Sequence, residues 1–254
     1  LYVLKASEQR LREAGQSGSQ MNVNTEIVKG LTVRIPSDRQ EQERIATTLW
    51  DVDDLIESLS RLVAKKQAVK QGMMQELLAG RTRLAGFSTP WERRRLGDLL
   101  TYEQPGPYLV SSTDYVGNGT PVLTAGKTFL LGYTADRHGI YDAVPVIIFD
   151  DFTTASKYVD FPFKAKSSAM KILSARPGVC LRYIYERMQL IDFVAVDHKR
   201  RWITEYSKLE MGMPDFDEQE AIASVLDAAD SEIRALQDRL AKAQAVKTGM
   251  MQEL

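Results

Sequence analysis

Residues 41–77 read EQERIATTLWDVDDLIESLSRLVAKKQAVKQGMMQEL, and residues 218–254 read EQEAIASVLDAADSEIRALQDRLAKAQAVKTGMMQEL. The two stretches keep one offset, since 218 − 41 = 177, and about 21 of their 37 aligned positions are identical. Repetition over this length indicates one supersecondary unit that is used twice, with a different block between the copies.

Both copies carry apolar residues at alternating steps of four and three, which is the spacing of a coiled-coil seam. The seam positions are Ile45, Leu49, Val52, Ile56, Leu59 and Val63 in the first copy, and Ile222, Leu226, Ile233, Leu236 and Leu240 in the second. The period lasts for about five heptads, longer than most helices need to pack on a domain. We therefore predict helices over 39–80 and 216–254. The alternative is that each helix packs on its own globular domain, and spacing alone does not decide whether the seam closes within one chain or between two.

Composition is that of a protein with a sizeable core, because 44% of the 254 residues are hydrophobic and the net charge is only −1. The single cysteine, Cys180, excludes a disulfide framework and favours a reducing compartment. No apolar run reaches the length of a membrane span of about 20 residues, and no signal peptide is visible, so we expect a cytoplasmic protein. The chain opens at Leu1 in a helical pattern and stops at Leu254 within the seam, which suggests a fragment.

The block between the two helices has the signals of a β-rich domain. Apolar and β-branched runs predict strands at 120–124, 128–134 and 144–152, and 178–191 is the best helical stretch. Before the first long helix we expect a helix over 1–15, a loop at 15–20, a short helix with its N-cap at Asn24, and a strand at 31–36 that ends at Pro36. Residues 81–94, which are interrupted by glycine, serine, threonine and proline, are expected to be a linker.

Catalytic motifs are not found in this block. Residues 125–128, AGKT, resemble the end of a phosphate-binding loop, but Pro121 stands where that motif needs its first glycine. Asp150 and Asp151 lack the carboxylate and lysine partners of a metal nuclease, and neither His138 nor His198 has a metal-binding partner at a suitable spacing. These absences favour a binding or scaffolding protein over an enzyme, with no metal site.

Basic residues gather in two runs. Arg81, Arg83, Arg93, Arg94 and Arg95 follow the first long helix, where a solvated face and a phosphate-binding patch are equally consistent with the pattern. The second run is His198, Lys199, Arg200 and Arg201, followed by Trp202. An aromatic ring beside cations favours nucleic-acid contact in the second run.

Several ordered motifs resemble those of the specificity (S) subunits of Type I restriction-modification systems. The junctions between domain and helix carry the first set: Pro36 with Gln40–Ile45, then Gly80–Leu84 with Gly86, Phe87, Trp91, Leu96 and Gly97. The central block carries the second set: Pro121–Thr128, Val146–Thr154, Lys164–Met170 and His198–Ile203. The resemblance covers nearly the whole chain.

The resemblance implies an α+β fold in which two long α-helices pair as an antiparallel coiled coil and hold two target recognition domains, which read a bipartite DNA sequence. In this chain, residues 1–38 would be the C-terminal remnant of the first target recognition domain, and 95–215 would be the complete second one, with small helices. A helix of about 38 residues spans roughly 57 Å, enough to set readers about one turn of B-DNA apart.

For the DNA contacts we expect polar and basic side chains at strand ends. Contact with DNA is expected from Lys127, Thr128, Lys164, Lys166, Ser167, Ser168, His198, Lys199, Arg200, Arg201 and Trp202. Of these, Lys164, Lys166, Ser167 and Ser168 form a run suited to phosphate, and Lys199, Arg200 and Arg201 could combine phosphate contact with base readout. Asp150 or Asp151 could accept a hydrogen bond from cytosine, and Thr153 or Thr154 could meet a thymine methyl group. A cap or an ion pair is an equally good interpretation of the two aspartates.

The resemblance also implies partners. Two modification subunits would bind S-adenosylmethionine and methylate adenine, two restriction subunits would use ATP and Mg²⁺, and this chain itself would hold no cofactor. A competing interpretation is a coiled-coil structural or oligomerisation protein with an embedded β-rich domain, which predicts no sequence-dependent affinity for DNA.

Overall fold

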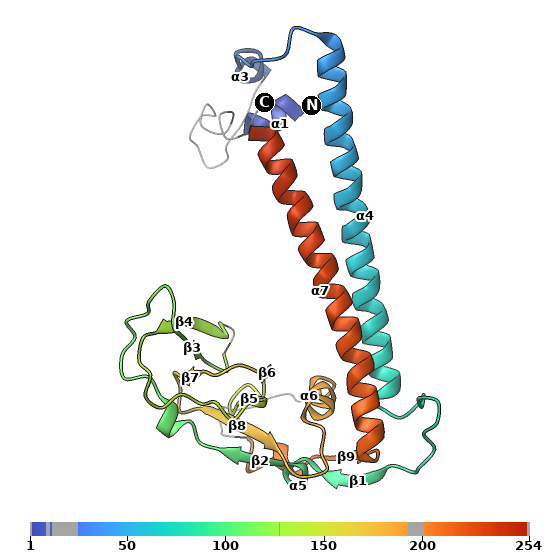
Figure 1. The fold of residues 1–254 in the computed structure, drawn as a ribbon, viewed down its shortest axis with the longest axis vertical. Coiled ribbons are helices and arrows are strands. Elements are labelled where there is room, and N and C mark those ends of the chain that lie inside the picture. The colour runs from blue at the N-terminus through green and yellow to red at the C-terminus, as the bar shows by residue number, and fades with distance from the viewer. Residues whose placement is uncertain (1, 9–10, 12–24, 127, 193–200, 253–254) are drawn as a thin grey trace. The chain divides into compact units, whose positions relative to one another are not determined.

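The computed structural model of the protein describes residues 2–8, 11, 25–126, 128–192 and 201–252 (Figure 1). The chain divides into two compact units, each of which is described by itself. The stem unit comprises Leu1–Val69 and Ala229–Leu254, and the sheet unit comprises Lys70–Ala228. These boundaries lie inside the two long helices, because the last turns of one and the first turns of the other contribute side chains to the core of the sheet unit.

The two predicted long helices are confirmed as α4 (Arg39–Leu77) and α7 (Phe216–Gln252). Helix α4 is followed by Gly80, whose amide donates to the carbonyl of Leu77 and whose φ of 70° is a left-handed value that glycine adopts without strain. None of the helices in the described part of the chain is long and apolar enough to cross a membrane.

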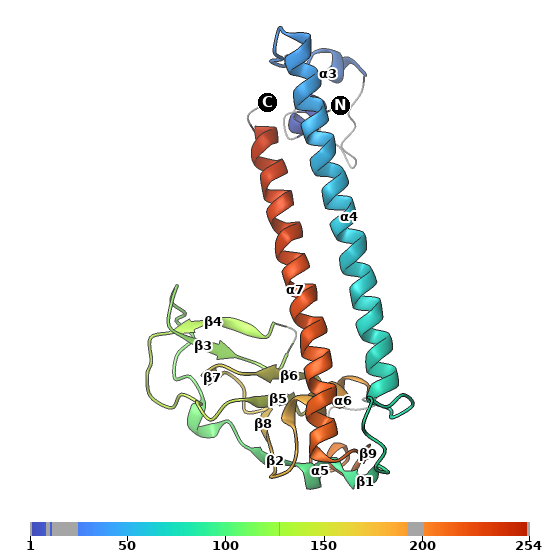
Figure 2. The same cartoon turned by 45° about the vertical axis from the view of Figure 1, so that its right-hand side comes forward.

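In the stem unit, α4 and α7 run side by side (Figures 1 and 2). Leu59, Val63, Leu236 and Ala243 form a buried cluster, with Ile56 and Leu240 packed against it. Lys66 contacts Glu232 at 2.7 Å, and Lys247 contacts Asp53, so later residues of α4 meet earlier residues of α7. This order makes the pairing antiparallel and closes this part of the seam within one chain. All eleven predicted seam residues are buried or half-buried.

The start of the stem unit agrees with expectation in part. The structure has α1 (Tyr2–Ala6) and α3 (Thr25–Lys29), and α3 is the short helix expected after Asn24. The rest of the helix predicted over 1–15, the loop at 15–20 and Asn24 itself lie mostly or wholly outside the described residues. The strand predicted over 31–36 is wrong, since these residues belong to no sheet. A strand needs a partner for its backbone groups, and no described strand lies beside this stretch.

The described residues of the sheet unit form three small sheets (Figure 1). The four-stranded sheet has the order β2 (Leu100–Glu103), β8 (Met170–Ala175), β5 (Val146–Asp150), β6 (Ser156–Val159), and all its neighbours are antiparallel. The three-stranded sheet has the order β4 (Leu130–Thr134), β3 (Thr120–Leu123), β7 (Lys164–Ala165). The third sheet pairs β1 (Glu92–Arg95) with β9 (Glu210–Met213).

Short helices complete the sheet unit: α5 (Leu96–Leu99), α6 (Leu181–Gln189), and the 3₁₀ helices η1 (Gly106–Tyr108) and η2 (Tyr206–Lys208). Strand β5 is the centre of the core, with Val146, Ile147, Ile148 and Phe149 fully buried. Because alternate residues of a strand point to opposite faces, Ile147 and Phe149 pack in one core cluster and Val146 and Ile148 in another. The predicted strands at 120–124, 128–134 and 144–152 and the helix within 178–191 are confirmed.

Candidate nucleic-acid interface

Four segments that are far apart in the sequence meet at one edge of the sheet unit, where β3, β5 and β7 end. The amide of Lys166 donates to the carbonyl of Leu123 at 2.9 Å, which joins the turn after β7 to the end of β3. The amide of Asp151 donates to the carbonyl of Ala169 at 3.2 Å, and that of Arg201 donates to the carbonyl of Asp151 at 2.9 Å. We call the described residues 124–126, 128, 150–155 and 166–169 the loop edge.

The loop edge carries most of the polar side chains that the sequence singled out. Thr128, Thr153, Lys166 and Ser168 are exposed, and Asp150, Thr154 and Ser167 are half-buried. Asp150 Oδ1 accepts hydrogen bonds from the amides of Phe152 at 2.9 Å and Thr153 at 3.3 Å, so this carboxylate shapes the turn that presents the threonines. Thr154 has a φ of 61°, a conformation that is strained for a β-branched residue and that closes the same turn.

Asp151 lies behind this surface, which corrects the expectation that it reads a base. The residue is 1% exposed. Oδ1 accepts hydrogen bonds from the amides of Arg201 at 3.0 Å and Trp202 at 2.8 Å, and Oδ2 lies 3.4 Å from Lys171 Nζ. A buried carboxylate with these partners anchors the chain at residue 201 and is shielded from solvent. The sequence left two interpretations open for Asp151, a contact to a base and a cap or ion pair. The structure shows the cap and the ion pair.

Trp202 and Arg201 are also buried, at 2% and 3% exposed. The expectation that these two residues contact DNA directly is therefore corrected as well. The Trp202 ring packs edge-on against Phe149, with ring centroids 5.3 Å apart, and lies beside Tyr206. The same burial raises the pKa of the Tyr206 hydroxyl to about 12. An indole that fills a core has no face left for stacking on a base.

Lys164 is the fourth predicted contact that proves buried, at 2% exposed. Its ammonium lies 2.7 Å from Asp136 Oδ2 and donates to the carbonyl of His138. The hydrogen bond from Lys164 lowers the pKa of the Asp136 carboxyl. Lys164 therefore fastens the loop after β4 to β7, because a buried ammonium must be paired.

Four predicted contacts lie outside the described residues: Lys127, His198, Lys199 and Arg200. Their roles stay predictions. Arg201 and its hydrogen bonds to Asp151 mark the place where the second basic run joins the described structure, next to the turn 150–155.

Sequence reasoning did not single out Lys171. This lysine, 1% exposed on β8, balances the charge of Asp151, and its ammonium lies 5.5 Å from the centroid of the Tyr102 ring. The sequence did indicate a buried ion pair here, because a lysine in the largely apolar strand MKILSA needs a buried anion as its partner. The partner could not be named, because the pairing depends on the register of β5 and β8.

The first arginine run is mostly engaged in ion pairs. Arg81 contacts Glu76 at 3.1 Å, Arg83 contacts Glu218 at 2.5 Å, and Arg93 and Arg95 contact Glu210 at 3.3 Å and 3.7 Å. These contacts favour a structural role for Arg83 above all, because its partner is fully buried.

On either side of residue 127, the described residues 124–126 and 128 do not have the arrangement of a phosphate-binding loop. This stretch joins the antiparallel strands β3 and β4 and is closed by a hydrogen bond from the amide of Thr124 to the carbonyl of Phe129. A phosphate-binding loop instead leads from a strand into a helix, whose N-terminus holds the phosphate. Among the described residues, no group of three or more histidine, cysteine, aspartate or glutamate side chains is placed to hold a metal ion.

No protein-family model matches the chain. Over 138 residues, which are 52% of this chain, the sequence is 51% identical to the specificity subunit of the Type I restriction enzyme EcoR124I/EcoR124II of Escherichia coli. The match covers 34% of that relative, so this chain spans well under two thirds of the relative's length.

The fold is similar to that of the S subunit of a Type I restriction-modification system from M. genitalium, with a TM-score of 0.71 at 15% identity. That likeness covers 99% of this chain and 70% of the other. A second chain, from a structure that describes complex assembly and conformational transition of the type I R-M system, has a TM-score of 0.50 at 14% identity and covers 98% of this chain and 67% of that one. The resemblance drawn from the motifs is thus confirmed: the fold is similar to that of a Type I S subunit, and 138 residues are 51% identical in sequence to a Type I specificity subunit.

Proposed function

We propose that this chain is the sequence-specific DNA-binding component of a Type I restriction-modification complex and has no catalytic role of its own. The observation that carries the proposal is the 51% identity to a specificity subunit over about half of the chain. The loop edge supports it, because exposed hydroxyl and ammonium groups from three separate turns are fastened into one surface by backbone hydrogen bonds. Rigid presentation of such groups is what base recognition requires.

Within the loop edge, the exposed Lys166 is the candidate for phosphate contact, with Ser167 and Ser168 beside it. Thr153 and Thr154 present methyl and hydroxyl groups from the turn that Asp150 shapes, and they are the candidates for base contact. Lys127, His198, Lys199 and Arg200 remain candidates from the sequence. The sheet unit would read one half of a bipartite target.

We further propose that the stem holds the partner subunits. Helix α4 exposes Leu55, Leu62 and Val69, which are 46%, 38% and 49% exposed and lie one heptad apart, away from the seam. An apolar stripe of this kind suits another helix. The modification subunits, with S-adenosylmethionine, would dock here, and the restriction subunits, with ATP and Mg²⁺, would join the same complex. The length of the stem would then set the gap between half-sites.

Selection of bound sequences from a random DNA pool, with the modification subunit present, tests the proposal. We expect enrichment of a fixed set of bases. Lys166→Ala should weaken binding to all sequences similarly and reduce the slope of log affinity against log salt by about 1. Lys208→Ala is the matched control, because Lys208 is exposed but lies outside the loop edge. Binding without any enriched sequence would instead favour a coiled-coil structural protein.

A further inference from the structure

An ion pair between β5 and β8 lies directly beneath the loop edge. Asp151 follows β5 and Lys171 is the second residue of β8, and each is 1% exposed. The Asp151 Oδ2 atom lies 3.4 Å from Lys171 Nζ, and we call these two residues the buried pair. Lys171 stands opposite Phe149 in the antiparallel pairing, so its side chain lies on the face of the sheet that Trp202 covers. Two charges are thus placed in a core of aromatic rings, where each depends on the other.

Asp151 ties together three segments of the chain that meet at the loop edge. Its carboxylate atom Oδ1 accepts hydrogen bonds from the amides of Arg201 at 3.0 Å and Trp202 at 2.8 Å. Its own amide donates to the carbonyl of Ala169 at 3.2 Å. One buried residue therefore holds the turn 150–155 against the turn that ends at Ala169 and against the chain at Arg201.

Lys171 determines which way the Asp151 carboxylate faces. The two oxygens of a carboxylate lie in one plane, so a contact that fixes one oxygen also fixes the direction of the other. The ammonium of Lys171 holds Oδ2, and Oδ1 is thereby turned toward the two amides. The ammonium is held in place in turn, since it lies 5.5 Å from the centroid of the Tyr102 ring on the neighbouring strand β2.

The turn 150–155 presents its side chains from this anchor. The amide of Thr154 donates to the carbonyl of Asp150 at 2.9 Å, so the turn is closed on itself. Thr153 is exposed and lies two residues after Asp151 in this closed turn. A side chain that reads a base must be held to within about 0.5 Å of its productive position. A larger movement of Asp151 would therefore take Thr153 away from a base.

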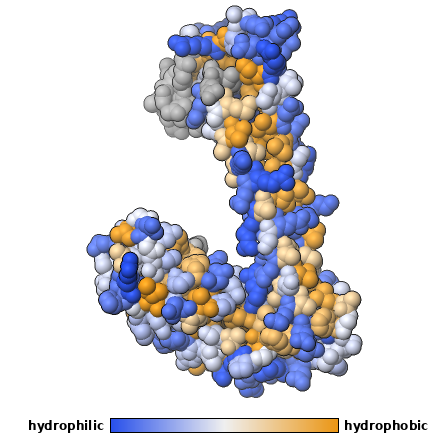
Figure 3. Space-filling view, viewed as in Figure 1, coloured by the Kyte–Doolittle hydropathy of each residue, from blue (hydrophilic) through white to orange (hydrophobic). Residues whose placement is uncertain are grey.

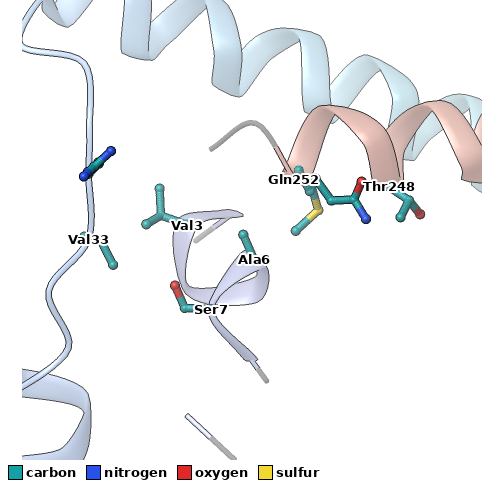
Figure 4. Close-up of a pocket in the computed structure, with 8 residues that line it drawn as sticks. Val3, Ala6, Ser7, Val33, Thr248 and Gln252 are labelled. Carbon is teal, nitrogen blue, oxygen red and sulfur yellow. The ribbon is translucent and has the colours of Figure 1, made fainter. Parts of the chain in front are cut away.

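Several other charged groups of the molecule are less buried. In the pairs Arg83–Glu218 and Lys164–Asp136, one side chain is 25% or 30% exposed. Figure 3 shows hydrophilic residues mixed with hydrophobic ones on the surface of the sheet unit. In the stem unit, a cavity of about 510 Å³ (Figure 4) has Arg34 as the charged residue of its lining, and Arg34 is exposed. Water can replace a lost partner at such places, whereas the buried pair is shielded from it.

We propose that the buried pair sets the sequence specificity of the loop edge without touching DNA: Asp151 and Lys171 are positioning residues for the turn 150–155. The inference rests on the proposed function of the loop edge. Removal of Lys171 would leave a carboxylate whose charge the core cannot solvate. The carboxylate would then turn toward water, release the amides of residues 201–202 and move the turn.

The test compares DNA specificity among variants with the modification subunit present. The measured quantity is the affinity for the duplex that the wild type selects, divided by the affinity for a random-sequence duplex. Thr153→Ala identifies the base positions that the turn reads. Lys171→Met should relax those same positions and lower the ratio about tenfold, which is the size of one lost base contact. Affinity for the random duplex and its salt dependence should stay unchanged, because the phosphate contacts remain.

Further variants separate positioning from a simple loss of stability, and all ratios are measured where circular dichroism shows each variant folded. Lys208→Met removes an exposed lysine outside the loop edge and should keep the wild-type ratio. The double variant Asp151→Asn, Lys171→Met removes both charges and keeps an oxygen that can accept from the two amides, so it should recover most of the tenfold loss. If Lys171→Met does not fold, Lys171→Gln replaces it, with a smaller loss expected because its side chain can still donate to Asp151.

Amide exchange of the chain without DNA gives a second readout. The amides of Arg201 and Trp202 should exchange faster in Lys171→Met than in the wild type, because the carboxylate that accepts from them has turned away. Their exchange in Lys208→Met should match the wild type. This readout follows the anchor itself and needs no assumption about DNA.

The proposal is overturned if Lys171→Met keeps the wild-type ratio, if it weakens binding to all sequences alike, or if it relaxes positions other than those of Thr153→Ala. A double variant as unspecific as Lys171→Met would overturn it too, and so would unchanged exchange at residues 201–202. A wild type that selects no sequence would overturn the proposed function and this inference with it. A wild type that selects a sequence, with Lys171→Met unchanged, would overturn this inference alone.

Discussion

The two junctions at which the long helices begin, residues 31–49 (the first junction) and residues 209–226 (the second junction), share the sequence Glu-Gln-Glu at 41–43 and 218–220 and a glutamine-to-proline hydrogen bond, yet they differ in burial. Glu218 is fully buried beside Arg83 and Trp91, whereas Glu41 is exposed. The difference shows that local sequence sets the helix start and its caps, while the segment packed over it decides how much each residue contributes to stability.

The largest expected difference in the loss of stability is between Ile222→Ala and Ile45→Ala. Ile222 is 1% exposed in the main core cluster, so its truncation should leave a cavity and cost about 2–5 kcal/mol. Ile45 is half-buried, and the same change there should cost about 1 kcal/mol. Thermal unfolding followed by amide exchange in each unit measures both values. Equal costs would mean that the first junction is as well packed as the second.

A smaller contrast is expected between Glu218→Gln and Glu41→Gln. The first change removes the charge that Arg83 contacts inside the closed junction, and we expect a loss of about 1–3 kcal/mol. The second change affects an exposed carboxylate and should stay within about 0.5 kcal/mol. Denaturant unfolding of both variants measures these two losses of stability. A loss from Glu41→Gln as large as that from Glu218→Gln would contradict an open first junction.

The smallest effect is expected from an ion pair of the stem. The hydrogen bond from Lys247, and a second one from Tyr2, lower the pKa of Asp53. Because the folded pKa lies below the unfolded value of about 3.9, this pair stabilises the stem above that pH, and its contribution is lost as the pH falls through the folded pKa.

Asp53→Asn should therefore reduce stability at neutral pH by about 1 kcal/mol or less, since Asp53 and Lys247 are 31% and 22% exposed, and should change it little at pH 2. Unfolding midpoints of the variant and the wild type, measured from pH 7 to pH 2, show how this difference in stability depends on pH. Asp51→Asn, at an exposed position of the same helix, is the control. A difference from wild type that persists unchanged at pH 2 would show that the pair is not its source.

The candidate site was predictable in part. Strand-end segments rich in threonine, serine and lysine do gather at one edge, and Thr153 and Lys166 are exposed there as expected. The sequence could not show that Asp151 and Lys164 are buried while Thr153 and Lys166 are exposed, because the burial of a charged residue depends on its partner elsewhere in the fold. Lys171 and Asp136 are those partners, and both lie about 20 or more residues away along the chain.

The sequence by itself determined the repeat, the two long helices and their seam, because the period of apolar residues along a helix is a local property. It also determined β3, β4 and β5, since runs of apolar and β-branched residues favour strands wherever they occur. Only the tertiary structure decided the antiparallel pairing within one chain, the burial of Asp151, Lys164 and Trp202, and the failure of residues 31–36 to form a strand. Each of these depends on a neighbour that is distant in sequence, and LTVRIP and LEMGMP, alike in pattern, became coil and strand because only the second has β1 beside it.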